Sequence, residues 1–528
     1  MRTNFYSRIL DQVRSIGCEV REDLTGCQRR LKAEVFPTSL QEISSVLRLA
    51  RHLGLKIHPV SCGRNWGFGS ELPTQQNCLV LNLARMNRIR QSDSARHFVE
   101  VEPGVTQGQL AAHLKSKGDT HFLNVTGAGL STSVLGNALE RGIGYFGSRD
   151  LDLLGTEVML ATGDVIRTGY EAERGGPAAQ LGPCLEGLFV QSGFGLVTSG
   201  TLRLSRKTAA MGALTLDIDD QKNLAMIMGQ IGDILSEGWI QGVPHLFNRK
   251  RLATTFGGSD ENWPAWLAVI PVRGPESLTD AFAREVKSRF QGLARVRQIG
   301  LGSGAGDSCT ELQALLPLLE GNPIDLALFS MAKTLDEGEP SLPQKEDFNP
   351  EKGTAGLIHV TPSCHLDGAS VLHLLNVVSR LATNNGFDEL PMSLNIVSPR
   401  HACLIISVCY KRDSSLQKSS ARKLADLLLA GTVAEGFRPY RLGLEQAALL
   451  SPLAKPLRLL CFELQRTLDP FQLFARSRYS HLWKSSAKSR SRGDVMSWPS
   501  SEAQSFLQTI EKQQHRTQGK LCSKNEGL

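Results

Sequence analysis

The segment that most constrains the fold is a glycine-rich loop directly after a short apolar run. The stretch HPVSCGRNWGFGSELP, residues 58–73, holds Gly63, Gly67 and Gly69, and the next apolar run begins only at Cys78. Glycine clusters occur where the backbone must approach another group closely. The spacing G-x-x-x-G-x-G matches neither the dinucleotide fingerprint nor the P-loop. By itself the segment is either an ordinary connection between strands or a loop that contacts a ligand.

Size and composition predict a multidomain globular protein. A chain of 528 residues is expected to form two or three domains, and 41% hydrophobic and 21% charged residues are ordinary proportions. The first twenty residues lack a basic segment followed by an apolar one, so neither a secretory signal nor a membrane span is expected. The eleven cysteines form no C-x-x-C pair, which favours reduced thiols in a cytoplasmic protein without a metal site.

The basic charge is concentrated near the end of the chain. The formal net charge is +7, and residues 480–528 hold eight lysines and arginines against four acidic residues. This serine-rich, basic stretch, residues 484–528, predicts a disordered tail. A solvated extension is favoured over a nucleic-acid arm because the rest of the chain shows no basic stripe interleaved with aromatics. We therefore expect no nucleic acid partner.

Local patterns predict short strands interleaved with helices up to about Arg203. Ser39 and Glu42 fit a capping box before apolar residues at helical spacing, and a strand follows at residues 56–60. Further strands are expected at 78–83 and 97–102, a helix at 105–118, and a hairpin at 157–169. Between Ala209 and Arg438 longer helices alternate with apolar strands, interrupted by polar loops at 302–311 and 334–354. Residues 302–306 are expected to form a flexible hinge, and the second loop is expected to be mobile.

Four segments in register resemble one enzyme family. PVSCGRNWGFGSELP, SVLGNALERGIGYFG, GPCLEGLFVQSGFGLVT and LDPFQLFARSRY occur in this order within roughly residues 35–480. Together they resemble the vanillyl-alcohol oxidase and p-cresol methylhydroxylase family of FAD-dependent oxidoreductases.

The resemblance implies an α+β, two-domain FAD-binding fold. A PCMH-type FAD domain of two small α/β subdomains would span residues 1–207, and a substrate domain of antiparallel sheet and helices would span 208–438. A C-terminal segment, 439–483, would return to the FAD domain.

The resemblance also implies which residues contact FAD. The first glycine loop would wrap the pyrophosphate and offer backbone N–H groups to its charge. The segment around residues 133–137 would lie along the flavin, and residues 195–198 would bring a strand edge to its ring system. The implied cofactor residues are Pro59, Ser61, Cys62, Gly63, Arg64, Asn65, Gly67, Ser133, Gly136, Asn137, Gly195, Val197 and Arg478.

The substrate residues are implied in the same way. The family binds a phenolate with a Tyr-Arg pair and a tyrosine of the first loop; here Tyr440 and Arg441 match the pair, and Phe68 stands at the loop position. Phe68 lacks the hydroxyl of the family's tyrosine, but the charge of Arg441 still implies an anion site that would hold a phenolate or a carboxylate.

Two departures bear on mechanism. The vanillyl-alcohol branch has an aspartate before the "GN" loop, and LNVTGAGLSTSVLGN contains no acid. The histidine that carries that branch's covalent flavin bond corresponds to Leu357, so FAD is expected to be non-covalent. His359, where the branch has phenylalanine, is a candidate general base, and a flavin tether or a structural or substrate-binding role is the alternative.

The resulting hypothesis is an FAD-linked oxidase or dehydrogenase that removes a hydride from a small phenolic or benzylic substrate. Alternatives are a 2-hydroxy-acid or alcohol dehydrogenase and a flavin-binding module with a degenerate substrate site. Oxygen or a redox protein would reoxidise the flavin, and the resemblance suggests a homodimer.

Overall fold

The computed structural model describes residues 10–22, 30–74, 78–169, 182–302, 307–333, 349–444 and 446–482. The chain divides into two compact units, one of Met1–Ser451 and Leu464–Leu482 and the other of Pro452–Glu463 and Trp483–Leu528. The predicted tail lies outside the described residues, as do most of the predicted hinge and the centre of the predicted mobile loop. The strands of the described sheets all lie in the first unit, and α12 (Lys455–Leu468) begins in the second.

A small mixed sheet carries the glycine loop. Its order is β1-β2-β4-β3, with β4 parallel to both β2 and β3. The strands are β1 (Glu19–Glu22), β2 (Arg30–Phe36), β3 (Lys56–Val60) and β4 (Cys78–Asn82). Helix α2 (Leu40–His52) packs on this sheet, and the Ser39 hydroxyl accepts a hydrogen bond from the Glu42 N–H at 3.2 Å. The predicted helix, its cap and the strand after it are confirmed.

The second sheet is antiparallel and has the order β11-β10-β12-β6-β5. Its strands are β5 (Ile89–Asp93), β6 (Phe98–Val101), β10 (Leu153–Met159), β11 (Val165–Gly169) and β12 (Leu196–Arg203). The predicted hairpin is therefore confirmed as β10 and β11. Helices α3 (Gln107–Ser116) and α4 (Val134–Leu139) follow β6, and short pairs join β7 (His121–Phe122) to β13 (Ser205–Arg206) and β8 (Ile143–Gly144) to β9 (Gly147–Ser148).

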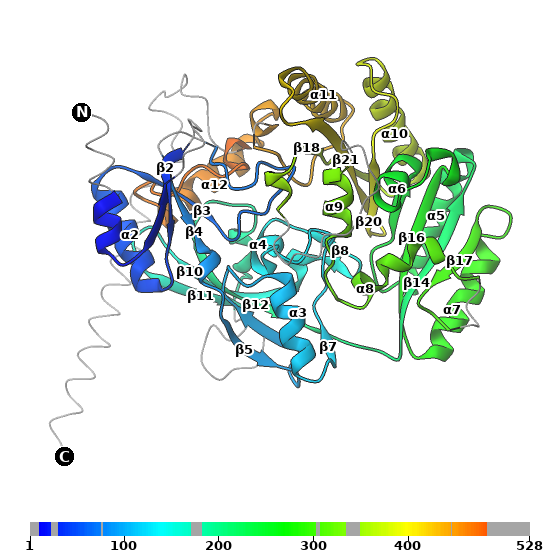
Figure 1. The fold of residues 1–528 in the computed structure, drawn as a ribbon, viewed down its shortest axis with the longest axis horizontal. Coiled ribbons are helices and arrows are strands. Elements are labelled where there is room, and N and C mark those ends of the chain that lie inside the picture. Colours follow the sequence, from blue (N-terminus) through cyan, green and yellow to red (C-terminus); the bar gives the residue numbers. More distant parts are fainter. Residues whose placement is uncertain are drawn as a thin grey trace. The chain divides into compact units, whose positions relative to one another are not determined.

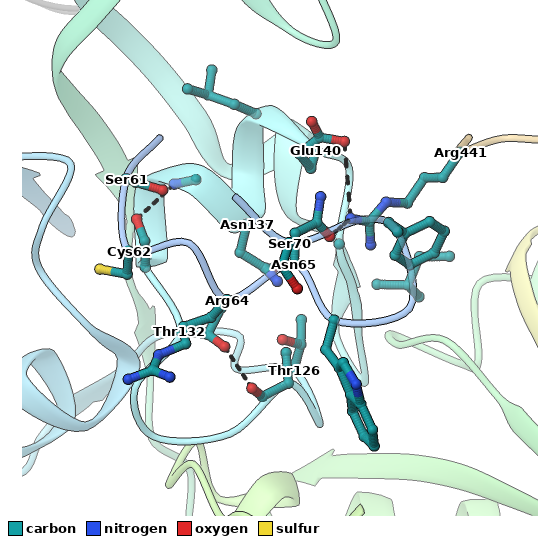
Figure 2. A pocket seen from close by; sticks show the side chains of 18 of the residues that line it. Ser61, Cys62, Arg64, Asn65, Ser70, Thr126, Thr132, Asn137, Glu140 and Arg441 are labelled. Atoms are coloured by element: carbon teal, nitrogen blue, oxygen red, sulfur yellow. Dashed lines mark hydrogen bonds and ion pairs between the residues drawn. The ribbon is translucent and has the colours of Figure 1, made fainter. Parts of the chain in front are cut away.

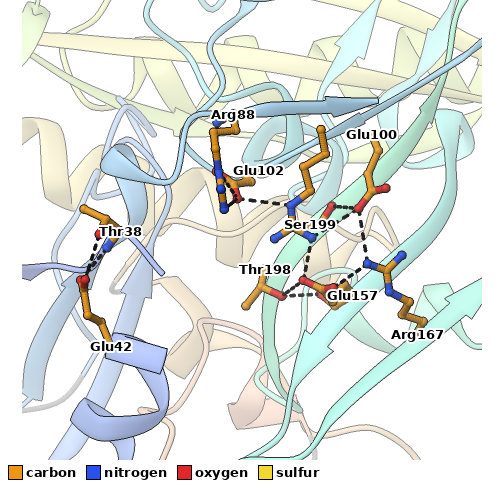
Figure 3. Close-up of polar contacts among 10 residues, drawn as sticks. Thr38, Glu42, Arg88, Glu100, Glu102, Glu157, Arg167, Thr198 and Ser199 are labelled. Atoms are coloured by element: carbon orange, nitrogen blue, oxygen red, sulfur yellow. Dashed lines mark hydrogen bonds and ion pairs between the residues drawn. The ribbon is translucent and has the colours of Figure 1, made fainter. Parts of the chain in front are cut away.

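An ionic network crosses the second sheet (Figure 3). Arg90 contacts Glu157 at 2.9 Å, Glu102 at 3.2 Å and Glu100 at 3.3 Å. Arg88 also binds Glu102, which is fully buried, and Arg167 binds Glu157 at 2.8 Å. Burial opposes the charge of Glu102 and Glu157, but these contacts leave the pKa of both carboxyls lowered. Removing one cation from this network would be destabilising because it would leave a buried carboxylate short of a partner.

The third sheet has eight strands, and the pairings along it are antiparallel. The order is β17-β14-β16-β15-β20-β21-β18, with β19 paired to β21. The strands are β14 (Ala210–Ile218), β15 (His245–Asn248), β16 (Trp266–Gly274), β17 (Arg295–Ile299), β18 (Ala355–Val360), β19 (Ser363–His365), β20 (Met392–Ser398) and β21 (His401–Lys411). The predicted antiparallel sheet with helices is confirmed (Figure 1).

Six helices and one short helical turn accompany this sheet. Their bounds are α5 (Leu224–Ser236), α6 (Arg249–Phe256), α7 (Glu276–Arg289), α8 (Leu316–Leu319), α9 (Leu326–Lys333), α10 (Gly368–Thr383) and α11 (Ser415–Ala434). Side chains of α5, α7, α10 and α11 share one apolar core with alternate residues of the strands, such as Leu394 and Leu404. A separate apolar core lies between α2 and the first sheet.

The other face of the third sheet is directed into a cavity. In a strand, successive side chains point to opposite faces. Leu246 and Leu394 belong to the core, so their neighbours His245 and Asn395 point the other way, where they line the cavity and are paired across β15 and β20. The same alternation puts His359 on the cavity side of β18.

The C-terminal part of the first unit returns to the glycine-loop sheet. Ile57 of β3 donates its N–H to Leu473 at 2.9 Å and accepts one from Ala475 at 2.7 Å. The buried Asp469 carboxylate accepts the N–H groups of Leu473 and Phe474 and fixes this turn. The chain thereby brings Arg478 and Tyr479 to the cavity. The division into an FAD domain and a substrate domain near residue 207 stays a prediction.

Candidate active site

One cavity of about 450 Å³ extends from the glycine loop to the third sheet. The loop after β3, the start of α4, the segment before β12 and residues 474–479 line one part, and β15, β18, β20 and α6 line the other. Figure 2 shows Arg64, Asn65, Asn137, Glu140 and Arg441 around it.

The structure brings nearly all predicted site residues to this cavity. Gly67 is the one that does not line it. Those that do are Pro59, Ser61, Cys62, Gly63, Arg64, Asn65, Ser133, Gly136, Asn137, Gly195, Val197, His359, Tyr440, Arg441 and Arg478.

Gly67 is required for a contact within the protein. Its φ is +79°, and a Cβ there would stand 2.4 Å from the His359 ring. The Gly67 carbonyl also accepts the His359 N–H at 3.0 Å. A Cβ added at Gly195 would likewise stand 2.5 Å from the Val158 side chain. Gly67 thus approaches His359 closely, and its predicted approach to a pyrophosphate stays a prediction.

The cofactor side fits a dinucleotide with a pyrophosphate. The loop between β3 and β4 lines the cavity and carries Arg64, whose charge suits an anion. Gly136 packs so tightly against the loop that a Cβ would meet the Ser61 hydroxyl at 2.2 Å. Among the described residues the buried Asn137 amide oxygen has no hydrogen-bond partner, which leaves it free to accept from a ligand.

Arg441 is held in place by the first glycine loop. Its Nη2 donates to Asn65 Oδ1 at 2.7 Å and lies 3.9 Å from Glu140 Oε2, and its Cζ stands 4.0 Å above the Phe68 ring (Figure 2). Its buried Nε has no partner among the described residues. Burial raises the pKa of the neighbouring Tyr440, so its hydroxyl remains a neutral donor. The pair therefore presents a cation and a hydrogen-bond donor to one ligand.

Sequence reasoning missed Glu140 and the residues around it. Glu140 lies 3.4 Å from Arg478 and accepts the Tyr479 hydroxyl at 2.9 Å. Gln191 donates to the Tyr440 carbonyl at 3.0 Å and to the Tyr479 hydroxyl at 3.1 Å. Glu140 follows the predicted segment by three residues, but nothing in the sequence pairs it with arginines more than three hundred positions away.

His359 is neutral at physiological pH. Burial, together with the charges of Arg251 and Arg441, lowers its pKa to about 3. Its Nδ1 is 3.3 Å from the Ser407 hydroxyl, and its ring stands 5.1 Å from that of Phe68. The low pKa bears on its candidate role as general base, because burial beside two cations disfavours the imidazolium. Such a group is a weak base and a good neutral hydrogen-bonding partner.

The charge of the cavity is mostly positive. Its described lining contains the guanidinium groups of Arg64, Arg251, Arg441 and Arg478, and Glu140 is the only acid. Arg251 was not singled out from the sequence, since it is one of three adjacent basic residues, NRKR, at the start of α6. The lining thus favours anionic ligands.

The chain is similar to known FAD-binding proteins. Residues 31–169 match the FAD binding domain family. The 1'-carboxy-chondrochloren decarboxylase of Chondromyces crocatus is 27% identical and is aligned over 86% of this chain and 92% of its own. The 4-cresol dehydrogenase (hydroxylating) flavoprotein subunit of Pseudomonas putida is 25% identical, with 84% of this chain and 87% of its own covered.

Solved structures share the fold. p-Cresol methylhydroxylase with substrate bound has a TM-score of 0.78 at 20% identity, covering 90% of this chain and 96% of its own. The 4-ethylphenol oxidase of Gulosibacter chungangensis, in complex with isoeugenol, has a TM-score of 0.78 at 20% identity, with 90% and 97% covered.

The mixed fold, the cavity at the glycine loop and these similarities agree with the resemblance found in the sequence. The chain is an FAD-linked oxidoreductase with an FAD binding domain at residues 31–169, and its sequence and fold are similar to those of the vanillyl-alcohol oxidase and p-cresol methylhydroxylase family.

Proposed function

We propose that the protein oxidises a small aromatic substrate, a phenol or benzylic compound, at the carbon next to the ring. The observation that carries this is the Tyr440–Arg441 pair, held at the cavity by Asn65 and Glu140. The relatives named for a cresol and a carboxylated compound support a small organic substrate. Because Arg441 is permanently charged, it would hold the phenol as its phenolate.

FAD, when bound, takes up two electrons and one proton as a hydride from the substrate. The residues of the chain supply charge and orientation. Arg441 and the neutral Tyr440 hydroxyl would stabilise the phenolate, whose charge moves through the ring as the hydride leaves the benzylic carbon. The organic product of that step is a neutral quinone methide. Addition of hydroxide at the methylene carbon and a proton at the oxygen would then give the hydroxylated phenol.

We assign His359 to substrate binding rather than to proton removal. Its pKa of about 3 keeps it neutral, and the two arginines that lower the pKa would repel a second proton. The negative charge of a bound phenolate would offset part of the effect of the two arginines and raise the pKa of His359. The neutral imidazole N–H could then donate a hydrogen bond to the substrate. The role of flavin tether remains the alternative to be tested.

Five further assignments belong to the same proposal. FAD is held without a covalent bond, since Leu357 is an apolar, unreactive residue at the tether position. The enzyme acts in the cytoplasm as a homodimer, and oxygen or a redox protein reoxidises the flavin. The contacts of the described residues fit a substrate domain beginning near residue 208. None of the described helices is long and apolar enough to cross a bilayer.

The test is an anaerobic screen for bleaching of the flavin absorbance. Purified protein is mixed with para-alkyl phenols, benzylic alcohols and 2-hydroxy acids. Bleaching by the phenols or benzylic alcohols supports the proposal. Bleaching by 2-hydroxy acids alone would instead make Arg441 a carboxylate site. A probable mitochondrial D-lactate dehydrogenase of Danio rerio, 29% identical over 38% of this chain, makes that outcome worth testing. A yellow protein that no donor bleaches would indicate a degenerate substrate site.

A further inference from the structure

We infer that Arg251 binds a second anionic group, a carboxylate at the end of the substrate that lies away from the Tyr440–Arg441 pair. The inference rests on the proposed function and narrows the substrate class to phenols or benzylic compounds that carry a carboxylate.

The other three arginines of the described cavity lining have acids near them. Arg478 and Arg441 lie 3.4 and 3.9 Å from Glu140. The charge of Arg64 favours the ionised form of Asp325, whose carboxyl also accepts the Leu130 N–H at 2.8 Å. These charges are compensated, at least in part, by the protein itself.

Arg251 has no such acid among the described residues. Its side-chain partner there is the Met331 sulfur, 2.9 Å from Nη1, and a thioether is only a weak acceptor. The ionisable groups that act on it are Cys409 and Tyr145, both neutral because burial raises the pKa of each. His359, on which it acts in turn, is neutral too. No anionic side chain among the described residues therefore compensates the charge of the Arg251 guanidinium.

The backbone of Arg251 is firmly anchored, which fits a binding residue. Asn248, fully buried, accepts the Arg251 N–H at 3.0 Å and the Met392 N–H at 2.8 Å. The two basic residues before Arg251 have protein partners: Arg249 donates to the Trp263 carbonyl at 3.0 Å, and Lys250 pairs with Asp260 at 3.0 Å. Only the third side chain of this basic triplet enters the cavity.

An isolated cation inside a protein is costly unless an anion accompanies it. Burial lowers the pKa of Arg251, but arginine does not lose its proton in proteins, so the charge persists. The planar guanidinium matches the two oxygens of a carboxylate. The cavity also holds hydrogen-bond donors, since the Ser393 hydroxyl and the Asn395 side-chain amide NH2 belong to residues that line it. The geometry suits a small carboxylate next to an apolar body.

The experiment measures binding by the change in flavin absorbance under anaerobic conditions, at concentrations and times before turnover. The probes are three matched pairs: 4-hydroxyphenylacetate with 4-ethylphenol, 3-(4-hydroxyphenyl)propanoate with 4-propylphenol, and 4-(4-hydroxyphenyl)butanoate with 4-butylphenol. In the wild-type protein we expect the acid of at least one pair to bind about 10- to 100-fold more tightly than its alkyl partner, as one charge-assisted contact provides.

The variant Arg251→Met should abolish or reverse this preference, because a carboxylate then enters an apolar pocket. The control Lys250→Met, on the same helix, should keep it. Arg441→Met should weaken both members of each pair by a similar factor, because both share the phenol. Arg251→Lys retains the charge and serves if the methionine variant does not fold; it should keep part of the preference.

The outcomes separate the two proposals. If alkyl phenols bind and are oxidised but no acid is preferred in the wild-type protein, the carboxylate site is wrong and the proposed function stands. The same holds if the preference survives in Arg251→Met. If no phenol of either kind binds, this inference fails; if benzylic alcohols also fail to bleach the flavin in the screen, the proposed function fails as well.

Discussion

Arg441→Met is the most informative single perturbation of the proposed site. The variant removes the permanent charge that faces the substrate while keeping a side chain of similar length. A lost charge-assisted hydrogen bond costs about 1.5 to 3 kcal/mol, or roughly 10- to 150-fold in kcat/KM. Arg441→Lys should recover only part, because a point charge does not reproduce the guanidinium plane, which lies 4.0 Å above the Phe68 ring.

The fold should tolerate this variant. Glu140 keeps Arg478 at 3.4 Å and the Tyr479 hydroxyl at 2.9 Å, so losing Arg441 leaves no buried carboxylate alone. Asn65 loses its 2.7 Å partner, at a cost of about 1 kcal/mol. The flavin content of the purified variant should therefore match that of the wild type.

The assay is stopped-flow reduction of the flavin by the best donor of the screen, under anaerobic conditions, with flavin occupancy measured in the same sample. Arg438→Met is the matched control, since Arg438 is exposed and lies three residues earlier in the same segment. Unchanged kcat/KM in Arg441→Met, at full flavin occupancy, would refute the anion site.

Three further predictions rest on contacts of the described residues. Acid precipitation should release FAD into the supernatant because Leu357 stands at the tether position, and flavin fluorescence on the denatured band would point to His359 as the tether instead. His245 and His359 have a pKa of about 3 against about 6.5 in the unfolded chain, so stability is full above pH 6.5 and falls towards pH 3 by up to about 1.4 kcal/mol per pH unit for each. Urea unfolding at pH 7.5 and 5 should show a smaller drop for His359→Phe than for the wild type; equal drops would contradict the low pKa. Arg90→Met should lower the free energy of unfolding by about 3 kcal/mol because it strips contacts from two buried carboxylates, whereas Arg295→Met, in an exposed pair with Asp307, should change it by less than about 0.5 kcal/mol. Equal urea midpoints for these two variants would argue against the network.

Much of the local structure could be predicted from the sequence because it depends on neighbours in the chain. The Ser39 cap, the apolar stripe of α2 and the β10–β11 hairpin follow from spacing over fewer than fifteen residues. Alternation in β20 likewise determines that Ser393 and Asn395 point away from the core shared by Met392 and Leu394. The family motifs also marked most of the cavity lining, since they are short segments whose order is visible without the fold.

The charges of the site depend on the tertiary structure instead. Arg441 meets Asn65 across 376 positions, and Gly67 lies against the ring of His359 from another sheet. Periodicity tells which face of a strand a side chain takes, but not which distant group that face will meet. Whether Arg251 has a counterion, or His359 keeps a proton, is decided by burial and by charges from several elements. The sequence thus determined the elements and the cofactor loop, whereas the folded chain determined the electrostatics, because Coulomb and desolvation energies depend on distance in space.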